Sequence, residues 1–153
     1  MLLTDLITPE RIACDVDAQS KKRALEHLSE IISRTEDTIS SNDVFESLLA
    51  RERLGGTGVG HGVAIPHGRL KDNSHTLGAF IKLQKGVDYD AADLQPVDLL
   101  FALLVPKEST DEHLQILAQL AKMFSSEDFR QKLRNAETNQ AIYQLLSDWN
   151  ETV

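Results

Sequence analysis

The sequence predicts an α/β domain with a mixed central β-sheet and helices on both of its faces. Three observations lead to this prediction. Short apolar runs with strand periodicity alternate along the chain with longer segments of helical periodicity. Residues 99–105 are apolar without interruption, which is typical of a strand buried on both faces. The 153 residues contain no repeat or linker-like tract, so we expect a single domain over residues 1–153.

The first third of the chain predicts one strand and two helices. Apolar or small side chains alternate with others over residues 12–16, the pattern of a half-buried strand. Ser20 is a candidate N-cap for a helix with one apolar face, formed by Ala24, Leu25, Leu28, Ile31 and Ile32. A second helix is expected to begin near Ser40 or Ser41 and to end by Gly55, with inward residues Val44, Phe45, Leu48 and Leu49.

The rest of the chain alternates strands with helices. Residues 62–65 form a short apolar segment that stops at Pro66, and residues 77–83 and 97–105 are expected to form two further strands. Ser109 and Glu112 have capping-box spacing and predict a helix with inward residues Leu114, Leu117, Ala121 and Phe124. Two shorter helices are expected over residues 129–133 and 142–149, so helices should cover both faces of the sheet.

Composition limits the classes of function. With 24 acidic and 16 basic residues the net charge is −8, which disfavours nucleic acid as the main ligand. Cys14 is the single cysteine, so no disulfide can form within the chain, and a reducing compartment fits. The N-terminus has no basic segment before a long apolar stretch, and the longest apolar run is far too short to span a membrane. We therefore expect a cytoplasmic protein without membrane insertion.

Residues 55–69 contain the pattern with the most chemical information. Five glycines fall within residues 55–62, but no Gly-Lys-Ser/Thr ending, dinucleotide fingerprint or Gly-x-Ser-x-Gly elbow accompanies them. His67 follows Pro66 and precedes Gly68, a combination that can present an imidazole at the end of a strand. A neutral imidazole is nucleophilic near pH 7 and suits reversible phosphoryl transfer. The backbone N–H groups of the glycine-rich stretch are candidates to hold phosphate oxygens.

This segment resembles the active-site signature of a known family. Glu52, a six-residue spacer, Val59-Gly60, two residues and then residues 63–68 fit that signature at every defined position. The family is the mannitol/fructose-type (type 2) enzyme IIA family of the phosphotransferase system. Residues 47–52, 95–106 and 113–118 are also similar to it. The resemblance is greatest to the nitrogen-regulatory branch, whose free-standing enzyme IIA belongs to a regulatory phosphorelay.

The resemblance implies roles for individual residues. His67 would accept the phosphoryl group on Nε2 as a tele-phosphohistidine, with Nδ1 held by a partner. His113 would be the auxiliary histidine and Arg51 would stabilise the phosphate. Thr57 would either touch phosphate or brace the loop.

The residues alone leave simpler alternatives open for each of these positions. His113 could be a core histidine, although the first turn of a helix favours anions. Arg53 competes with Arg51 for the phosphate role, and Arg69 is more simply a surface charge.

The remaining histidines and the cysteine receive simpler interpretations. His61 and His75 raise the possibility of a metal site together with His67, but their spacings match no defined zinc pattern. His27 lies off the apolar face of its helix and is expected to be solvated. Cys14 lies on an apolar alternation and is expected in the core.

The resemblance also implies partners. The donor would be an HPr-like phosphocarrier of the nitrogen branch, and no cofactor is expected because that donor is itself a phosphohistidine. The output would be control of target proteins according to phosphorylation state, and the family points to potassium-transport or sensor-kinase proteins. The alternative is a fructose- or mannitol-specific enzyme IIA that passes phosphate to a IIB domain during sugar uptake. A phosphorylation-controlled binding module without an obligatory acceptor is the other alternative, and all three share His67.

Overall fold

The computed structural model describes residues 3–71, 73–109 and 112–149 of the chain. In chain order the elements are two short 3₁₀ turns, η1 (Leu3–Asp5) and η2 (Pro9–Arg11), then β1 (Ile12–Val16), α1 (Lys21–Thr35), α2 (Ser41–Arg53), β2 (Gly58–Gly60), β3 (Val63–Ala64), β4 (His67–Leu70), β5 (Leu77–Val87), β6 (Val97–Pro106), α3 (Glu112–Phe124), α4 (Glu127–Asn135) and α5 (Asn139–Asp148).

The strands form one mixed sheet in the order β1-β5-β6-β3-β2, and β4 also pairs with β6. β1 is parallel to β5, β5 is antiparallel to β6, and both β3 and β4 run parallel to β6. β3 and β4 follow one another along the same edge of β6, with Val63 opposite Leu99 and His67 opposite Leu103. Pro66 lies at the break between them, because proline has no N–H to donate to a ladder.

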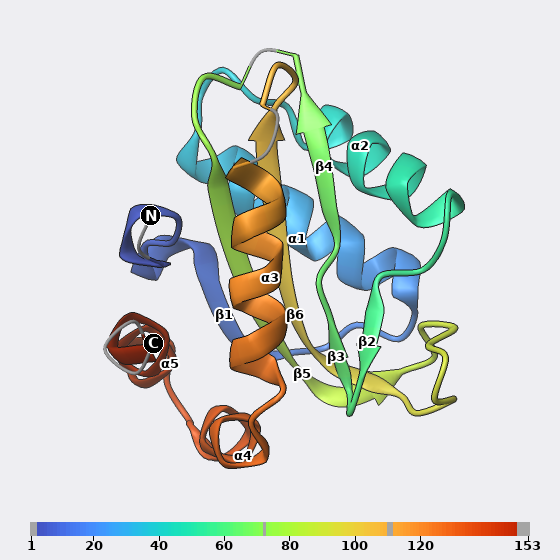
Figure 1. Cartoon of the computed structure of the whole chain (residues 1–153), viewed down its shortest axis with the longest axis vertical. Helices are drawn as coiled ribbons and strands as arrows, with labels where there is room; N and C mark the ends of the chain where they lie inside the picture. Colours follow the sequence, from blue (N-terminus) through green and yellow to red (C-terminus); the bar gives the residue numbers. More distant parts are fainter. Residues whose placement is uncertain (1–2, 72, 110–111, 150–153) are drawn as a thin grey trace.

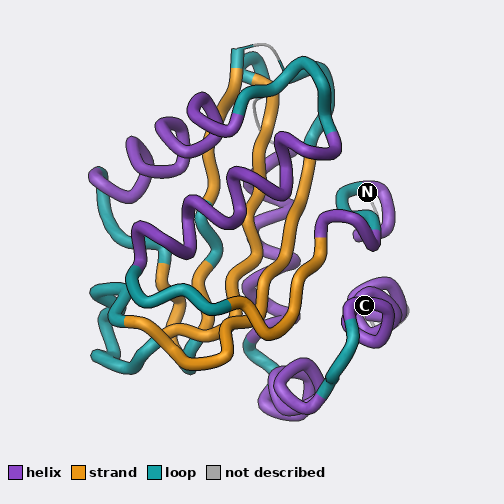
Figure 2. The backbone as a smooth tube through the Cα atoms, turned by 180° about the vertical axis from the view of Figure 1, so that it is seen from behind, coloured by secondary structure: helices purple, strands orange, loops and turns teal. Residues whose placement is uncertain are grey.

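Helices cover both faces of the sheet, as Figures 1 and 2 show. α1 and α2 pack on one face, and their side chains share an apolar cluster with Leu100, Ala102 and Leu104 of β6. α3, α4 and α5 cover the other face, where alternate residues of β6 such as Leu99 and Phe101 are buried. This two-sided burial explains the uninterrupted apolar run of β6. The predicted fold class is therefore confirmed.

Local signals placed the first two helices correctly. The Ser20 hydroxyl accepts a hydrogen bond from the Arg23 N–H (3.1 Å), and the Ser40 hydroxyl accepts one from the Asp43 N–H (3.1 Å). Both serines are therefore N-caps, as the sequence predicts. The predicted strand at residues 12–16 is confirmed, whereas β5 continues to Val87, four residues beyond its predicted end. β2 and β4 were not predicted, because segments of three and four residues are too short to show a strand period clearly.

The predicted inward face of α3 is partly wrong. Leu114 is 57 % exposed and Ala121 is exposed, whereas Leu117 is partly buried and Phe124 is buried. The buried stripe of the helix consists of Ile116, Leu120, Met123 and Phe124. This stripe has the i, i+4, i+7, i+8 spacing of a helix face, so the prediction had the correct period and the wrong phase. The predicted capping box spans residues 110–111, which lie outside the described residues.

Candidate phosphoryl-transfer site

A cleft of about 400 Å³ lies where α2, β4 and α3 meet. α2 contributes its last two turns, β4 contributes its first three residues, and α3 contributes its first turn. The floor is formed by β6. The described residues that line it are Ser47, Ala50, Arg51, Leu54, His67, Gly68, Arg69, Leu103, Val105 and His113.

Gly68 allows α2 to approach β4 closely enough to form this cleft. A Cβ atom at Gly68 would collide with the Ser47 side chain and would lie 3.1 Å from the backbone carbonyl carbon of Ser47. The Ser47 hydroxyl donates a hydrogen bond to the Arg69 carbonyl (2.9 Å), which joins the helix to the strand. The glycine after the histidine therefore serves helix–strand packing.

His67 is the first residue of β4 and is half-buried. Its Nδ1 lies 2.9 Å from the Ile65 carbonyl oxygen, so Nδ1–H is the donor and the lone pair is on Nε2. Burial lowers the pKa of His67 below its ordinary value of 6.5, although the hydrogen bond to Ile65 opposes this effect. Arg51 and His113 lower the pKa further through their charge, and Glu52 raises it. The ring is therefore neutral and nucleophilic near pH 7.

The structure brings Arg51 and His113 to the same cleft as His67. Arg51 lies in the last turn of α2, and its Nη1 donates a hydrogen bond to the Gly55 carbonyl (2.8 Å). Arg53, which is also described, is exposed and does not line the cleft. His113 lies in the first turn of α3, lines the cleft and is half-buried, so it is not a core histidine.

Arg69 is a cleft residue that the sequence interpretation treated as a surface charge. Its Nη2 lies 3.2 Å from the Nε2 atom of His113, and its Nη1 donates hydrogen bonds to the carbonyls of Lys107 (3.1 Å) and Ser109. The sequence contained a signal for it, because His67 and Arg69 are two residues apart and share one face of a strand. The strand itself was not predicted, so the signal was missed.

Thr57, a described residue, does not line the cleft. It is buried, and its hydroxyl donates a hydrogen bond to the carboxylate of Glu52. Its backbone N–H donates to the same carboxylate (3.2 Å). Of the two alternatives for Thr57, contact with phosphate or bracing of the loop, the geometry supports bracing.

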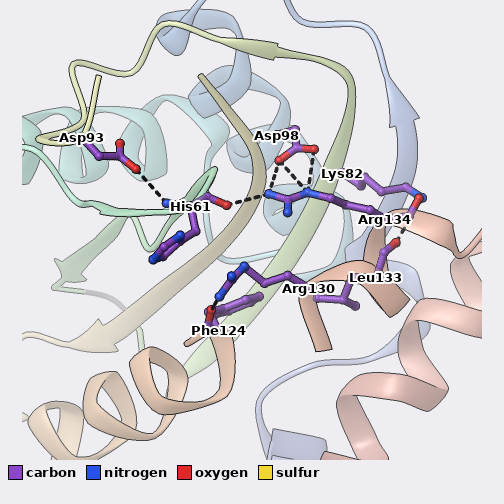
Figure 3. Close-up of polar contacts among 8 residues, drawn as sticks. All are labelled: His61, Lys82, Asp93, Asp98, Phe124, Arg130, Leu133 and Arg134. Atoms are coloured by element: carbon purple, nitrogen blue, oxygen red, sulfur yellow. Dashed lines mark hydrogen bonds and ion pairs between the residues drawn. The ribbon is translucent and has the colours of Figure 1, made fainter. Parts of the chain in front are cut away.

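The glycine-rich stretch does not form the phosphate cradle that the sequence suggested. Residues 55–62 are all described, and none of them lines the cleft. β2 and β3 pair as a hairpin, and hydrogen bonds hold both the N–H and the carbonyl of His61 at its turn (Figure 3). We call these contacts, made by Asp93 and Arg134, the hairpin clamp. The His61 N–H donates to the Asp93 carboxylate (2.9 Å), and the Arg134 guanidinium donates to the His61 carbonyl (2.7 Å) and to Asp98 (2.9 Å). These glycines provide the backbone angles and close packing of the hairpin.

The other histidines lie outside the cleft. His61 is exposed at the hairpin turn, and His75 pairs with Glu36 at 3.2 Å. His27 is half-buried on α1 rather than fully solvated. Among the described residues no group of three or more His, Cys, Asp or Glu side chains could hold a metal ion. Within the same residues, the helices are too short or too polar to cross a membrane.

Cys14 is half-buried rather than fully in the core. Its side chain packs against the apolar cluster on the α3 face, and its backbone N–H donates a hydrogen bond to the Asn139 side chain (2.9 Å). This contact lies at the free edge of β1, where an unpaired N–H would otherwise be open to another strand.

The cleft combines one nucleophilic nitrogen with three basic side chains. Two guanidinium groups, from Arg51 and Arg69, and the His113 imidazole can donate hydrogen bonds to an anion near His67. Apolar residues form much of the rest of the surface, including Leu54, which is 84 % exposed. A phosphate group delivered to His67 would therefore meet donors suited to its oxygens beside an apolar rim.

The chain is similar to known proteins over nearly its whole length. Residues 5–149 match the family model of the phosphoenolpyruvate-dependent sugar phosphotransferase system, EIIA 2. The nitrogen regulatory protein of Pseudomonas aeruginosa is 44 % identical over 146 residues, which cover 95 % of each chain. The crystal structure of the nitrogen regulatory protein IIA-Ntr from Neisseria meningitidis superimposes with a TM-score of 0.89 and 41 % identity, covering 94 % of this chain and 98 % of that one.

A sugar-specific relative is also similar. The fructose-specific EIIA component of the phosphotransferase system from Haloferax volcanii is 36 % identical over 151 residues, covering 97 % of this chain and 98 % of that protein. The family model spans almost the whole chain, and each of these relatives covers nearly its full length. The chain therefore belongs to the EIIA 2 family of the phosphoenolpyruvate-dependent sugar phosphotransferase system.

Proposed function

We propose that this protein is a phosphoryl carrier of the nitrogen-related phosphotransferase system, and that it accepts the phosphoryl group on Nε2 of His67. One observation supports this most directly. The Nδ1 atom of His67 is engaged by the Ile65 carbonyl, while Nε2 forms no hydrogen bond with another described residue, and the ring lines a cleft with Arg51, Arg69 and His113. The donor is a phosphohistidine on an HPr-like carrier of the nitrogen branch, as the family and the nitrogen regulatory relatives imply.

The transfer requires alignment and charge stabilisation more than new covalent chemistry. The Nε2 lone pair of His67 forms the new N–P bond while the N–P bond of the donor breaks, and that electron pair returns to the donor imidazole. The proton on Nδ1 stays in its hydrogen bond to Ile65. Arg51 and His113 stabilise the negative charge on the equatorial oxygens, since such donors are most effective in a partly dehydrated cleft.

The output of the carrier is regulation of target proteins according to phosphorylation state. The nitrogen regulatory relatives, at 41–44 % identity, support this assignment. The fructose-specific relative favours the second candidate, a sugar-specific enzyme IIA that transfers phosphate to a IIB domain. Phosphorylated protein that is mixed with a fructose-type IIB domain distinguishes the two. Retention of the label on this chain supports the regulatory function, and rapid transfer supports the sugar-specific one.

The central experiment is phosphorylation by phosphoenolpyruvate, enzyme I and an HPr-like carrier. We expect an acid-labile, alkali-stable adduct on wild-type protein and none on His67→Ala, because His67 is the proposed sole acceptor. His61→Ala is the matched control, since it removes another histidine of the same segment that does not line the cleft. If His67→Ala were labelled at the wild-type level, the assignment of His67 would be wrong.

A further inference from the structure

The buried carboxylate of Glu52 has no role in the proposed transfer chemistry. Its side chain is 2 % exposed at the end of α2, next to Arg51. It accepts hydrogen bonds from the N–H and the hydroxyl of Thr57 and forms an ion pair with the Lys21 ammonium at 2.9 Å. The Tyr89 hydroxyl lies 3.4 Å from the Thr57 hydroxyl. Moving a buried charge away from this many partners costs free energy, so the Glu52 carboxylate is held in one position and is a fixed point in the structure.

A chain of hydrogen bonds connects this fixed point with the His67 ring. The carboxylate of Glu52 holds both donors of Thr57. The Thr57 carbonyl accepts a hydrogen bond from the Ile65 N–H (3.0 Å). The Ile65 carbonyl then accepts the hydrogen bond from Nδ1–H of His67 (2.9 Å). We name these four residues, Glu52, Thr57, Ile65 and His67, the Glu52 relay.

We propose that Glu52 is a positioning residue that, through Thr57 and Ile65, holds the His67 ring in the tautomer with a free Nε2 lone pair. The tautomer of a histidine is set by the hydrogen bond at its other ring nitrogen. Here that acceptor is a backbone carbonyl, and the position of its residue depends on Thr57. The consequence for transfer rests on the proposed function, whereas the tautomer is a property of the unmodified protein.

The charge of Glu52 gives the relay a second measurable effect. Burial, Arg51 and His113 lower the pKa of His67, and the negative charge of Glu52 raises it. Arg69 also lies in this cleft, on the same strand as His67. Glu52→Gln removes the charge and is expected to lower the pKa of His67 further. Thr57→Val removes the hydroxyl bond to Glu52 but keeps the backbone N–H bond and the charge, so the two variants separate geometry from electrostatics.

Ring nitrogen NMR of the unphosphorylated, ¹⁵N-labelled protein tests the proposal. In wild-type protein the Nδ1–H tautomer of His67 should dominate. Glu52→Gln should increase the fraction protonated on Nε2 and move the titration of His67 to lower pH. Thr57→Val should change the tautomer in the same direction, and Thr57→Ser, which keeps the hydroxyl, should restore it. Glu30→Gln is the matched control, because it removes an exposed carboxylate from α1.

Transfer kinetics provide the second measurement. We expect Glu52→Gln to slow phosphorylation of His67 by about tenfold. This is the size of effect typical of residues that orient a functional histidine through hydrogen bonds without contacting the reacting atoms. The KM for the carrier should not change, because the Glu52 side chain is buried. A wild-type tautomer in folded Glu52→Gln and Thr57→Val would overturn the proposal, and Thr57→Val decides alone if Glu52→Gln does not fold. If wild-type protein accepts no phosphate, the proposed function fails while the tautomer result still stands.

Discussion

The proposed phosphoacceptor depends on a difference between the two nitrogens of one imidazole. Nδ1 of His67 is engaged by a carbonyl two residues earlier in the chain, at the break between β3 and β4. Within the described part of the chain, Nε2 has no hydrogen-bond partner, and His67 lines the cleft together with Arg51 and His113. The basic neighbours oppose protonation of the ring and can bind the incoming phosphate. The same charges therefore favour the neutral, nucleophilic imidazole and the proposed phosphorylated imidazole.

The lowered pKa of His67 gives a prediction about pH. Protonation removes the Nε2 lone pair, so the ring is a nucleophile only above its pKa. Because burial lowers this pKa below 6.5, NMR should show the ring titrating at lower pH in folded protein than in urea-denatured protein. Between the two pKa values the unfolded chain binds the extra proton, so the free energy of unfolding should fall as the pH drops through this window. A folded-state titration at or above 6.5 would contradict the prediction.

The two neighbours of His67 give a prediction about rate. Arg51→Ala and His113→Ala should each slow phosphoryl transfer by one to two decades, because each removes a charge-assisted contact of about 1.5–3 kcal/mol from the transition state. Single-turnover phosphorylation by the HPr-like carrier measures the effect. Arg53→Ala is the control, since Arg53 is exposed and does not line the cleft. A wild-type rate in folded His113→Ala would show that His113 is not an auxiliary residue.

At the scale of the elements, the site depends on how closely α2 packs against β4. Gly68 and Ser47 are in contact there, and the Ser47 hydroxyl bonds to the carbonyl of the next residue of the strand, Arg69. α4 is attached to the sheet in a comparable way, since the Lys82 ammonium of β5 donates hydrogen bonds to carbonyls at its C-terminus, including that of Leu133 (3.2 Å). Figure 3 shows this lysine beside the clamp on the β2–β3 hairpin.

Gly68→Ala tests the packing of α2 on β4. The new methyl group would collide with Ser47, so we expect a loss of about 1–3 kcal/mol in the free energy of unfolding and slower phosphorylation of His67. Gly56→Ala is the matched control, because the nearest atom to its Cβ would be the Asp90 carbonyl oxygen at 3.8 Å. Urea denaturation of both variants measures the difference. Equal stability of the two would show that the close approach at Gly68 is not required.

At the scale of the whole molecule, the cleft is built on regular elements around a sheet that is buried on both faces. The histidines and arginines of the cleft come from α2, β4 and α3, and each of these elements packs on an apolar cluster. Figures 1 and 2 show helices on both faces of this sheet, with α1 and α2 together behind it in Figure 1 and in front of it in Figure 2. Such a scaffold gives little reason to expect a large rearrangement when one side chain is modified.

The rigid scaffold leads to a prediction about regulation. A phosphoryl group adds roughly two negative charges to the cleft, and a target that binds the unmodified face would meet repulsion and a desolvation cost. We expect phosphorylation to change which proteins are captured while the amide spectrum changes only near the cleft. Capture with unmodified protein, phosphorylated protein and His67→Ala tests this expectation. Identical partners for all three would exclude the switch, and spectral changes throughout the domain would exclude the rigid scaffold.

The sequence determined the α/β class, the capped helices α1 and α2, and the histidine in its Pro-His-Gly context, because these depend on local periodicity and short motifs. It also offered Arg51 and Arg53 as candidates for contact with phosphate; that role and a single domain over residues 1–153 remain predictions. Tertiary structure decided what depends on contacts distant in sequence. The packing of α2 on β4 places Arg51 in the cleft, while Arg69 reaches His113, 44 positions later, and the hairpin clamp leaves the glycines of residues 55–62 outside the cleft. No local sequence pattern encodes these contacts, because the side chains involved are far apart in the chain and meet only when the helices pack on the sheet.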